Sequence, residues 1–398
     1  MTSRQETSAI RLLVFGITLL ATMGISSLLP ALPLLSGVFG VPIEKTWLII
    51  AAFTLPGLFC LPFAGVLADR LGRKRVLLPS LLLFAAGGVA CALAQTFAQL
   101  LLCRLIQGVG SASLGLMYTT IIADTWQGHE RLTMMSRNAM VLGFGTAASP
   151  ALGGALAMLD WRLPFLLPLS ALPLVFLACR LPLLTPALHT GLRSYASACL
   201  TCVKERKTLL LLALTLLTFI MLSGPLITCF PMLAGQAFQA SPLEVGLILA
   251  GASLAAGLAA TRLPGLYRSF SARALLLAAM ALYGVSFFSL ALAPGLWWLL
   301  PAIIVYGLAQ GLNIPLVSTL LTSQAPDGQR AALMALNGLL LRLGQNIGPA
   351  VFGTLAGAAG PAWAIVSGTI PAVLMALLAL GIHPPLSREH AETAAERS

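Results

Sequence analysis

The chain has 398 residues, of which 58% are hydrophobic and only 9% are charged. Soluble domains carry about 25% charged residues, so this composition excludes an ordinary soluble protein and places most of the chain in lipid. The net charge of +11 does not indicate nucleic-acid binding, because the sequence contains no soluble basic domain that could present it.

Hydrophobic runs separated by charged or Pro/Gly clusters predict an all-α integral membrane protein with twelve spans, each of about 20 apolar residues. The alternating pattern of a membrane barrel is not found. The expected organisation is a six-helix bundle (1–181), a central cytoplasmic loop (182–207), a second six-helix bundle (208–383) and a cytoplasmic tail (384–398). The spans are expected near residues 12–35, 46–67, 76–94, 98–123, 133–156, 163–181, 208–231, 243–262, 272–293, 296–320, 331–356 and 361–383.

Basic residues fall almost entirely on one side of these spans. With the N-terminus inside, nineteen Lys and Arg residues lie at the cytoplasmic face, and only Lys45 and Arg162 lie outside. Positive charge collects on the cytoplasmic side of membrane proteins, so both termini are predicted to be cytoplasmic. Arg104 and Arg342 are the two basic residues predicted within spans.

The segment between the second and third spans combines one acid with a basic cluster. A group that charged cannot lie in hydrocarbon, so it predicts a tight loop at the membrane surface. Asp69 is placed to pair across an interface within the protein, which suggests a gate; the alternative is that the charges only set the topology. The residues expected to act here are Gly65, Asp69, Arg70, Gly72, Arg73 and Lys74.

The fourth and fifth spans carry two further motifs. Arg104 is costly in hydrocarbon and should face the bundle interior or a wet cavity, whereas the alternative is snorkelling to the outer interface. Gln107 and Gly108 follow it. The fifth span contains glycines and a proline that allow close packing and a kink, and general packing is one interpretation of them. These residues are Gly145, Pro150, Gly153 and Gly154.

These motifs together resemble the major facilitator superfamily, and in particular its drug-exporting branch. The charged loop is similar to the family's loop between helices 2 and 3, almost letter for letter. The fifth span is similar to the antiporter motif Gly-x-x-x-Gly-Pro-x-x-Gly-Gly, with Ser149 in place of one glycine. Residues 24–33 and 160–162 extend the resemblance.

The resemblance implies a proton-driven exporter of small molecules that needs no bound cofactor. It also implies that Asp69 meets the start of helix 11 near Ala331, and that the matching arginine of the loop meets Asp124. Arg104 is implied to take part in proton coupling.

The second half carries faint copies of the first. Residues 257–262 are similar to 65–70, Gln310 and Gly311 repeat Gln107 and Gly108, and 348–350 repeat 149–151, each about 200 residues later. Two related bundles of this kind place the substrate between them near mid-membrane, and rocking of the halves alternates access. Thr261 and Gly307 stand where the first half has Asp69 and Arg104.

No acid or histidine is predicted in the middle of any span, so the residue that couples proton movement is unassigned. Asp69 and Asp124 are the remaining candidates, with uncoupled transport and a proton-carrying substrate as alternatives. In the resembled fold, helices 1, 4, 7 and 10 form most of the cavity. The expected lining residues are Ser27, Tyr118, Phe219, Ser223, Tyr306, Gln310 and Asn313, with Arg342 from helix 11.

Each of these residues has a packed core position as its alternative, and Arg342 could instead be a second partner of the Asp69 loop. We expect a monomeric exporter of small, largely apolar compounds in a bacterial cytoplasmic membrane. Its expected partners are a small-molecule substrate and the lipid bilayer, without nucleic acid. An exporter or facilitator of a sugar, an amino-acid derivative or another polar metabolite is the alternative. A membrane-embedded enzyme is disfavoured because no catalytic cluster is found, and no P-loop indicates ATP.

Overall fold

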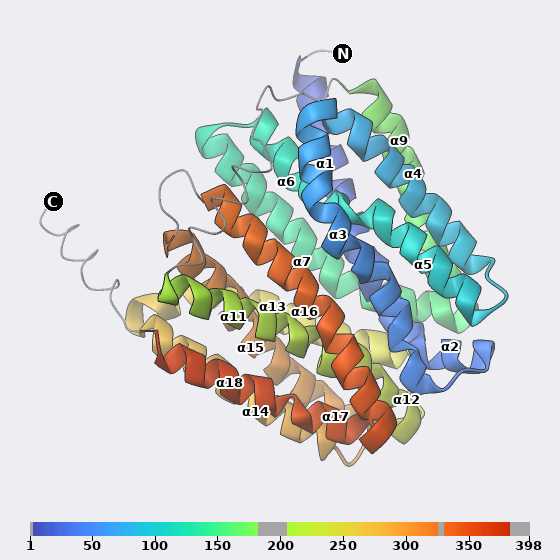
Figure 1. The fold of residues 1–398 in the computed structure, drawn as a ribbon, viewed down its shortest axis with the longest axis vertical. Coiled ribbons are helices and arrows are strands. Elements are labelled where there is room, and N and C mark those ends of the chain that lie inside the picture. Colours follow the sequence, from blue (N-terminus) through green and yellow to red (C-terminus); the bar gives the residue numbers. More distant parts are fainter. Residues whose placement is uncertain (1–2, 182–204, 325–329, 383–398) are drawn as a thin grey trace, which may run out of the picture.

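The computed structural model describes residues 3–181, 205–324 and 330–382, and every regular element in them is a helix (Figure 1). The predicted tail and nearly all of the predicted central loop lie outside the described residues. The first half contains α1 (Ser3–Ser26), η1 (Leu29–Ala31), α2 (Leu32–Phe39), η2 (Ile43–Lys45), α3 (Trp47–Leu71), α4 (Arg73–Ala92), α5 (Phe97–Ala112), α6 (Leu114–Thr125), α7 (Gly128–Leu159), α8 (Leu163–Leu166), η3 (Leu167–Ser170) and α9 (Ala171–Arg180).

The second half repeats this order of long and broken helices. It contains α11 (Arg206–Met221), η4 (Leu222–Cys229), α12 (Phe230–Phe238), α13 (Pro242–Ser269), α14 (Ala272–Ala291), η5 (Leu296–Trp298), α15 (Leu299–Gln324), α16 (Arg330–Ala359), α17 (Pro361–Ser367) and α18 (Thr369–Leu380).

Among the described residues, eleven helical stretches are long and apolar enough to cross a membrane. The one predicted span that is not among these eleven, 331–356, is occupied by α16, a helix of 30 residues whose hydropathy is lowered by its polar side chains. These side chains include Asn337, Arg342, Gln345 and Asn346. Each of the twelve predicted spans therefore contains a helix or a run of consecutive helices.

Several spans change helix type where proline interrupts the backbone ladder. Pro30 and Pro33 lie where α1 gives way to η1 and α2, because proline has no N–H to donate. In the second half, Pro225 lies within the π-helical turn η4. There the Thr228 hydroxyl donates to the Ser223 carbonyl oxygen at 2.8 Å. Such widened turns occur often at functional sites.

The two halves are inclined to each other and meet at one end. In Figure 1, α1 begins at the top and α11 begins at the left, whereas α2 and α12 lie together at the lower right. We call the end where α1 begins and α18 ends the terminal face, and the end that holds α2 and α12 the opposite face.

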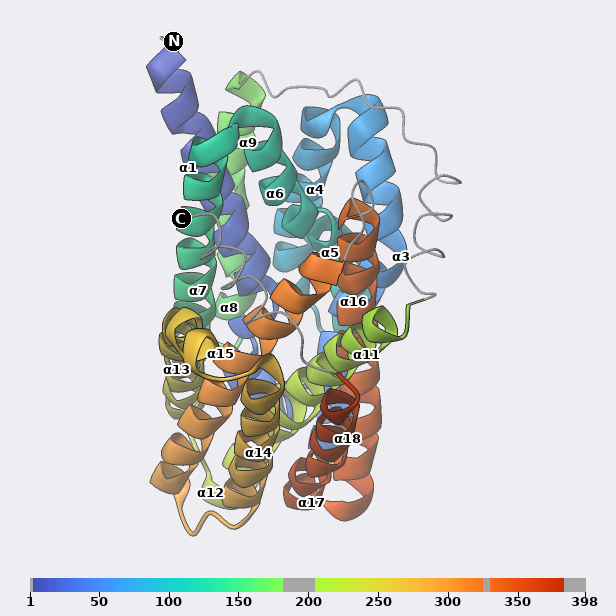
Figure 2. The same cartoon turned by 90° about the vertical axis from the view of Figure 1, so that its left-hand side faces the viewer.

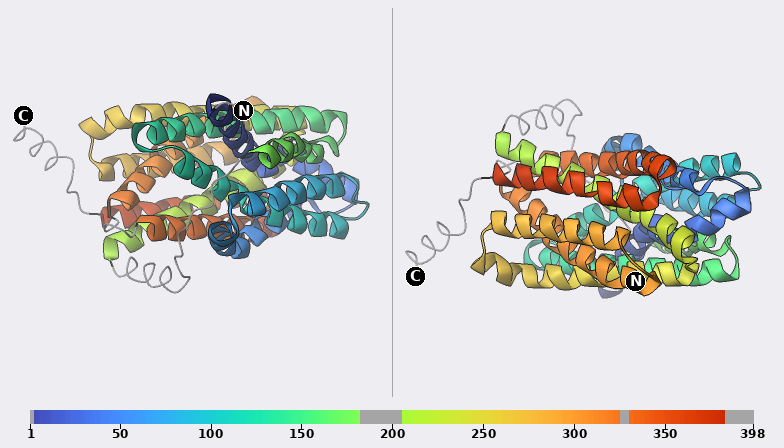
Figure 3. Two further views of the ribbon diagram at one scale, coloured as in Figure 1. Left: turned by 90° about the horizontal axis from the view of Figure 1, so that it is seen from above. Right: turned by 90° about the horizontal axis from the view of Figure 1, so that it is seen from below.

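Two seams join the halves, one between α7 and α13 and the other between α3 and α16. The seams lie along opposite edges of the molecule when it is seen from above (Figure 3). Within its own half, α16 also packs against α11, so it lies between the two halves (Figure 2). A residue on α16 can therefore contact both bundles.

Matching polar contacts confirm that the two halves are copies of one design. The Thr18 hydroxyl donates to Asn138 Oδ1 at 2.7 Å and ties α1 to α7. In the second half, the Thr215 hydroxyl donates to Asn337 Oδ1 at 2.8 Å and ties α11 to α16. Both pairs join the first span of a half to its fifth span. The faint sequence repeat did not include them, because a Thr and an Asn about 120 residues apart form no local pattern.

Candidate functional site

The charged loop at the terminal face is a tight turn with an ion pair beside it. Gly72 joins α3 to α4 with φ of 96°, a backbone conformation that glycine adopts without a steric cost. Arg73 Nε lies 2.9 Å from Asp124 Oδ2, and the two side chains are 7% and 21% exposed. This is the contact between the loop and the end of α6 that the resemblance implied.

Lys74 extends the same junction to the last helix of the first half. Its Nζ donates to the carbonyl oxygen of Cys179 in the last turn of α9 and to that of Leu181, which directly follows α9. Carbonyl oxygens at the end of a helix have no donor partner within that helix. The turn is therefore anchored to both α6 and α9.

The expected latch between the halves lies outside what the structure describes. The surroundings of Gly65 and the side chains of Asp69 and Ala331 are not among those described, and Arg70 is exposed. A pairing of Asp69 with the start of α16 stays a prediction, and so does the gating role of the loop.

Replacing Asp124 tests the ion pair on which the turn rests. We expect Asp124→Asn to lower the free energy of unfolding by on the order of 1 kcal/mol, because a carboxylate that is one-fifth exposed is partly screened. A double-mutant cycle with Arg73→Gln, measured by thermal unfolding in detergent, should give a coupling energy of similar size. Additive effects of the two substitutions would show that the pair contributes nothing.

Arg104 lies wholly inside the first bundle, with 2% of the residue exposed. Its Nη2 donates to the Gly24 carbonyl oxygen at 2.9 Å, and its Nε donates to the Ile49 carbonyl oxygen at 3.3 Å. Nη1 donates to Gln107 Oε1 at 2.6 Å, and the guanidinium carbon lies 4.2 Å from the Phe53 ring centroid. This single side chain joins α1, α3 and α5, so the snorkelling alternative is wrong.

The second half replaces this arrangement with direct helix contact. A Cβ at Gly307 would lie 2.2 Å from the Ala252 carbonyl oxygen, so the helices approach where the first half inserts an arginine. Gln310, the counterpart of Gln107, therefore has no counterpart of Arg104 on its own helix, and it is only half-buried. In the described residues no hydrogen bond of its side chain is found, and Gln310 therefore remains a cavity candidate.

The glycines of α7 serve two different contacts. A Cβ at Gly145 would lie 2.6 Å from Thr22 Oγ1, and one at Gly153 would lie 1.8 Å from the Ser27 carbonyl oxygen, both within the first half. Gly154 faces the other half, where a Cβ would lie 2.3 Å from the Pro242 carbonyl oxygen. Reciprocally, a Cβ on Gly246 of α13 would lie 2.4 Å from the Pro150 carbonyl oxygen. The motif therefore builds the α7–α13 seam at the opposite face.

Four of the predicted lining residues are packed inside a bundle instead. Ser27 donates to the Met23 carbonyl oxygen, and Ser223 donates to the carbonyl oxygen of Gly344 at 3.0 Å. Tyr306 is 1% exposed and packs against Tyr283, and the centroids of the two rings are 5.0 Å apart. Asn313 is fully buried and donates to Thr218 Oγ1 at 2.8 Å. For these four, the core alternative is the correct one.

The remaining candidates Tyr118, Phe219 and Arg342 are partly exposed. The Arg342 side chain reaches from α16 across the seam to α3 and α6. A Cβ added at Gly57 of α3 would lie 3.6 Å from the nearest Arg342 atom, and one added at Gly115 of α6 would lie 3.9 Å from it. Gly57 is twelve residues from Asp69 on the same helix, or about 18 Å, so the contacts favour the cavity alternative over pairing with the Asp69 loop.

Three further polar residues accompany Arg342, and the sequence-based prediction missed them. Gln345 Oε1 accepts from Arg342 Nη1 at 3.4 Å, and Asn346 Nδ2 donates to the Arg342 carbonyl oxygen at 2.8 Å. Asn346 Oδ1 also accepts from the Thr54 hydroxyl of α3 at 3.0 Å, which is a hydrogen bond between the halves. Polar residues at positions i, i+3 and i+4 of an apolar helix share one face, and that pattern could have revealed the cluster.

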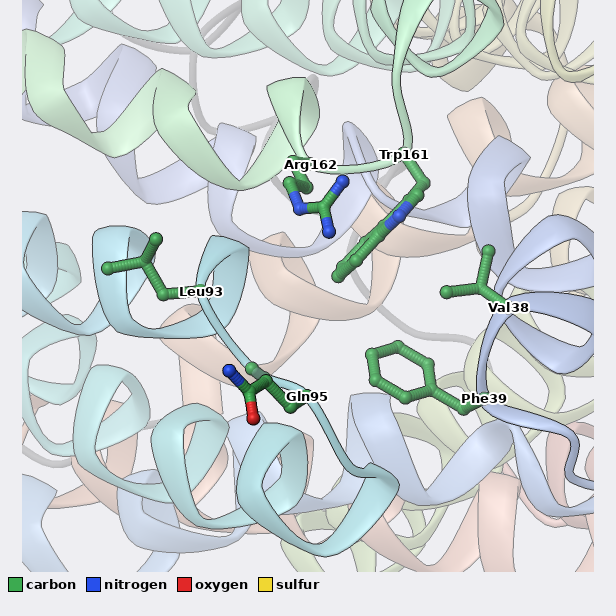
Figure 4. Close-up of a pocket in the computed structure, with 7 residues that line it drawn as sticks. Val38, Phe39, Leu93, Gln95, Trp161 and Arg162 are labelled. Atoms are coloured by element: carbon green, nitrogen blue, oxygen red, sulfur yellow. The ribbon is translucent and has the colours of Figure 1, made fainter.

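A separate pocket of about 450 Å³ opens at the opposite face of the first half (Figure 4). Phe39 and Trp161 form its aromatic side, and the Arg162 guanidinium lies 4.6 Å from the Trp161 ring centroid. Arg162 Nη1 also lies 3.5 Å from Asp160 Oδ2. Tryptophan is enriched at membrane–water interfaces, which agrees with the place of Trp161 between two predicted spans.

Comparison with known proteins agrees with this architecture. A family model described as the Major Facilitator Superfamily matches residues 14–233 and 209–398. The chain belongs to the Major Facilitator Superfamily. The expected twelve-helix, two-bundle fold is confirmed, and the enzyme alternative is set aside because the family consists of transporters.

Individual relatives match over different lengths. The bacillibactin exporter of Bacillus subtilis (strain 168) is 34% identical over 157 residues, which are 38% of this chain and only 39% of that protein. The quinolone resistance protein NorA of Staphylococcus aureus (strain MSSA476) is 24% identical over 336 residues, covering 84% of this chain and 86% of NorA. The crystal structure of a D-xylose–proton symporter superposes with a TM-score of 0.77 at 17% identity, covering 95% and 98% of the two chains.

Proposed function

We propose that this protein is a secondary transporter that exports small, largely apolar organic molecules across a bacterial cytoplasmic membrane. The proposed mechanism is alternating access between the two halves, driven by the proton gradient. The family membership and the similarity to the bacillibactin exporter and NorA support the proposal.

The single observation that carries the proposal is that the two halves are in close contact at the opposite face and diverge at the terminal face. The close backbone approaches at Gly154 and Gly246 lie at the opposite face, as does Gly353, whose Cβ would lie 2.3 Å from the Trp47 ring. The ends of the halves at the terminal face are inclined apart (Figure 1). We infer from the charge distribution that the terminal face is cytoplasmic, so this conformation would be open to the cytoplasm, which is one of the two states that alternating access requires.

The coupling carboxylate is proposed at the terminal face. In the described part of the chain, the acids lie near helix ends, and Asp124 is paired with Arg73. Asp69 and Asp124 are therefore our candidates for the groups that exchange protons with the cytoplasm. The polar cluster around Arg342 favours one further candidate function, the export of polar metabolites.

Transport by the purified protein tests the proposal. Proteoliposomes would receive a fluoroquinolone or an organic dye, and an imposed pH gradient should drive protein-dependent movement of at least one probe. Gly154→Val, which obstructs the α7–α13 seam, should slow this movement markedly. Rates equal to those of empty liposomes for every probe would overturn the proposed function.

A further inference from the structure

The two arginines within the spans differ in how well the protein satisfies them. Arg104 donates from all three of its nitrogens to acceptors within the bundle and is 2% exposed. In the described residues, Arg342 makes one side-chain hydrogen bond, from Nη1 to Gln345 at 3.4 Å, and it is partly exposed. A guanidinium has five N–H donors, so most of those on Arg342 remain available to a ligand.

The guanidinium of Arg342 lies between the halves and not within one bundle. It extends from α16 toward Gly57 of α3 and Gly115 of α6, and Tyr118 lies one helical turn beyond Gly115 on the same face of α6. A Cβ at Gly115 would meet no atom closer than 3.9 Å, and that atom is Arg342 Nη2. The two glycines therefore leave space beside the charged group, and Tyr118 lies one turn away on α6.

No described carboxylate can neutralise this charge. Asp124 is held by Arg73, and Asp160 lies beside Arg162 at the opposite face. The other described acids lie at or near helix ends: Glu6, Glu44, Glu130, Glu205 and Glu244. A positive charge held within a membrane is costly unless it is paired, so an anion from outside the described residues would be stabilised at this position.

We propose that Arg342 binds an anionic group of the substrate, with the Tyr118 hydroxyl as a second donor. The matching ligand is an organic anion, with a carboxylate, sulfonate or phosphate that accepts two parallel N–H bonds from the guanidinium. Gln345 orients the guanidinium, and the Thr54–Asn346 hydrogen bond holds α16 against α3 beside it. This inference rests on the transport function proposed above and narrows its substrate class to molecules with an apolar body and a negative charge.

Charge-matched probes test the inference on the purified full-length protein. Radiolabelled naphthoate, its neutral amide and naphthylmethylammonium share one apolar body, as do the equivalent benzene and anthracene compounds. Equilibrium binding would be measured for the wild type, Arg342→Gln, Arg342→Lys and the control Arg162→Gln. Transport of the same probes would be measured in proteoliposomes.

The expected result is preferential binding of the carboxylates by the wild type. Arg342→Gln should weaken carboxylate binding about tenfold or more while leaving amide binding unchanged, since only the charge-assisted bonds are lost. Arg342→Lys should recover part of the affinity, and Arg162→Gln should behave as the wild type. Equal binding of all charges, or carboxylate binding that survives in Arg342→Gln, would overturn the inference. If the wild type moves the fluoroquinolone or the dye but does not prefer the carboxylates, the inference alone fails; if it moves none of these compounds, the transport proposal fails as well.

Discussion

Replacing Arg104 by alanine is expected to unfold the first bundle at a markedly lower temperature. The guanidinium supplies hydrogen bonds to three helices, and its removal leaves Gln107 Oε1 without its strongest donor. Hydrogen bonds from a buried charged group contribute roughly 1.5–3 kcal/mol each without being additive, so we expect a loss of about 3 kcal/mol or more. The loss would appear as a lower melting temperature in detergent.

The conservative variant separates a structural role from proton coupling. Lysine carries the same charge but a single ammonium, and it cannot reach the Gly24 and Ile49 carbonyl oxygens and Gln107 in the same geometry. Arg104→Lys should therefore also melt early, whereas the exposed control Arg162→Ala should not. A variant at Arg104 that keeps wild-type stability but loses pH-driven transport would contradict this account and support the coupling role that the resemblance implies.

Replacing Gly154 by valine is expected to prevent the halves from closing at the opposite face. A Cβ at this position would lie 2.3 Å from the Pro242 carbonyl oxygen, so α7 and α13 must separate. Overpacking of this kind costs about 1–3 kcal/mol, and the cost falls on the one conformation that contains the contact. Each 1.4 kcal/mol is about a tenfold change in population, so transport should fall between about fivefold and about a hundredfold.

Other glycines of the same two helices provide the controls. A Cβ at Gly143 of α7 or at Gly257 of α13 would meet nothing within 4 Å. Gly143→Val and Gly257→Val should keep near-normal transport, while Gly246→Val should reproduce the defect of Gly154→Val. Transport rates in proteoliposomes, corrected for the amount of folded protein, make the comparison. Equal loss in all four variants would indicate a general effect of valine in these helices and not a seam.

The architecture was predictable because hydrophobic length and charge act locally along the chain. Each span is a run of apolar residues, and the basic cluster near Arg73 marks a loop without reference to any other segment. The inward orientation of Arg104 followed from the cost of placing its charge in lipid. What the sequence could not supply was the identity of its acceptors, because two of them are backbone carbonyl oxygens at Gly24 and Ile49.

The lining residues were harder to predict, because a membrane helix is apolar on every face. Ser223 and Asn313 are polar residues in the expected helices, yet each hydrogen-bonds inside its own half. Helical periodicity fixes which residues share a face but does not say whether that face meets a neighbour or a cavity. Gln345 and Asn346 were missed because the expected walls were helices 1, 4, 7 and 10, while α16 contributes the polar face.

Joining the halves reversibly at the opposite face tests alternating access most directly. Gln236 Nε2 of α12 donates to Glu44 Oε1 at 3.5 Å, so these two side chains meet across the halves. A short cleavable cross-linker between cysteines at Glu44→Cys and Gln236→Cys should stop transport in proteoliposomes, and its cleavage should restore it. Each single cysteine variant, treated in the same way, controls for reaction at the native cysteines. Transport that continues while the halves are cross-linked would contradict the account, because the substrate would then cross without opening of the opposite face.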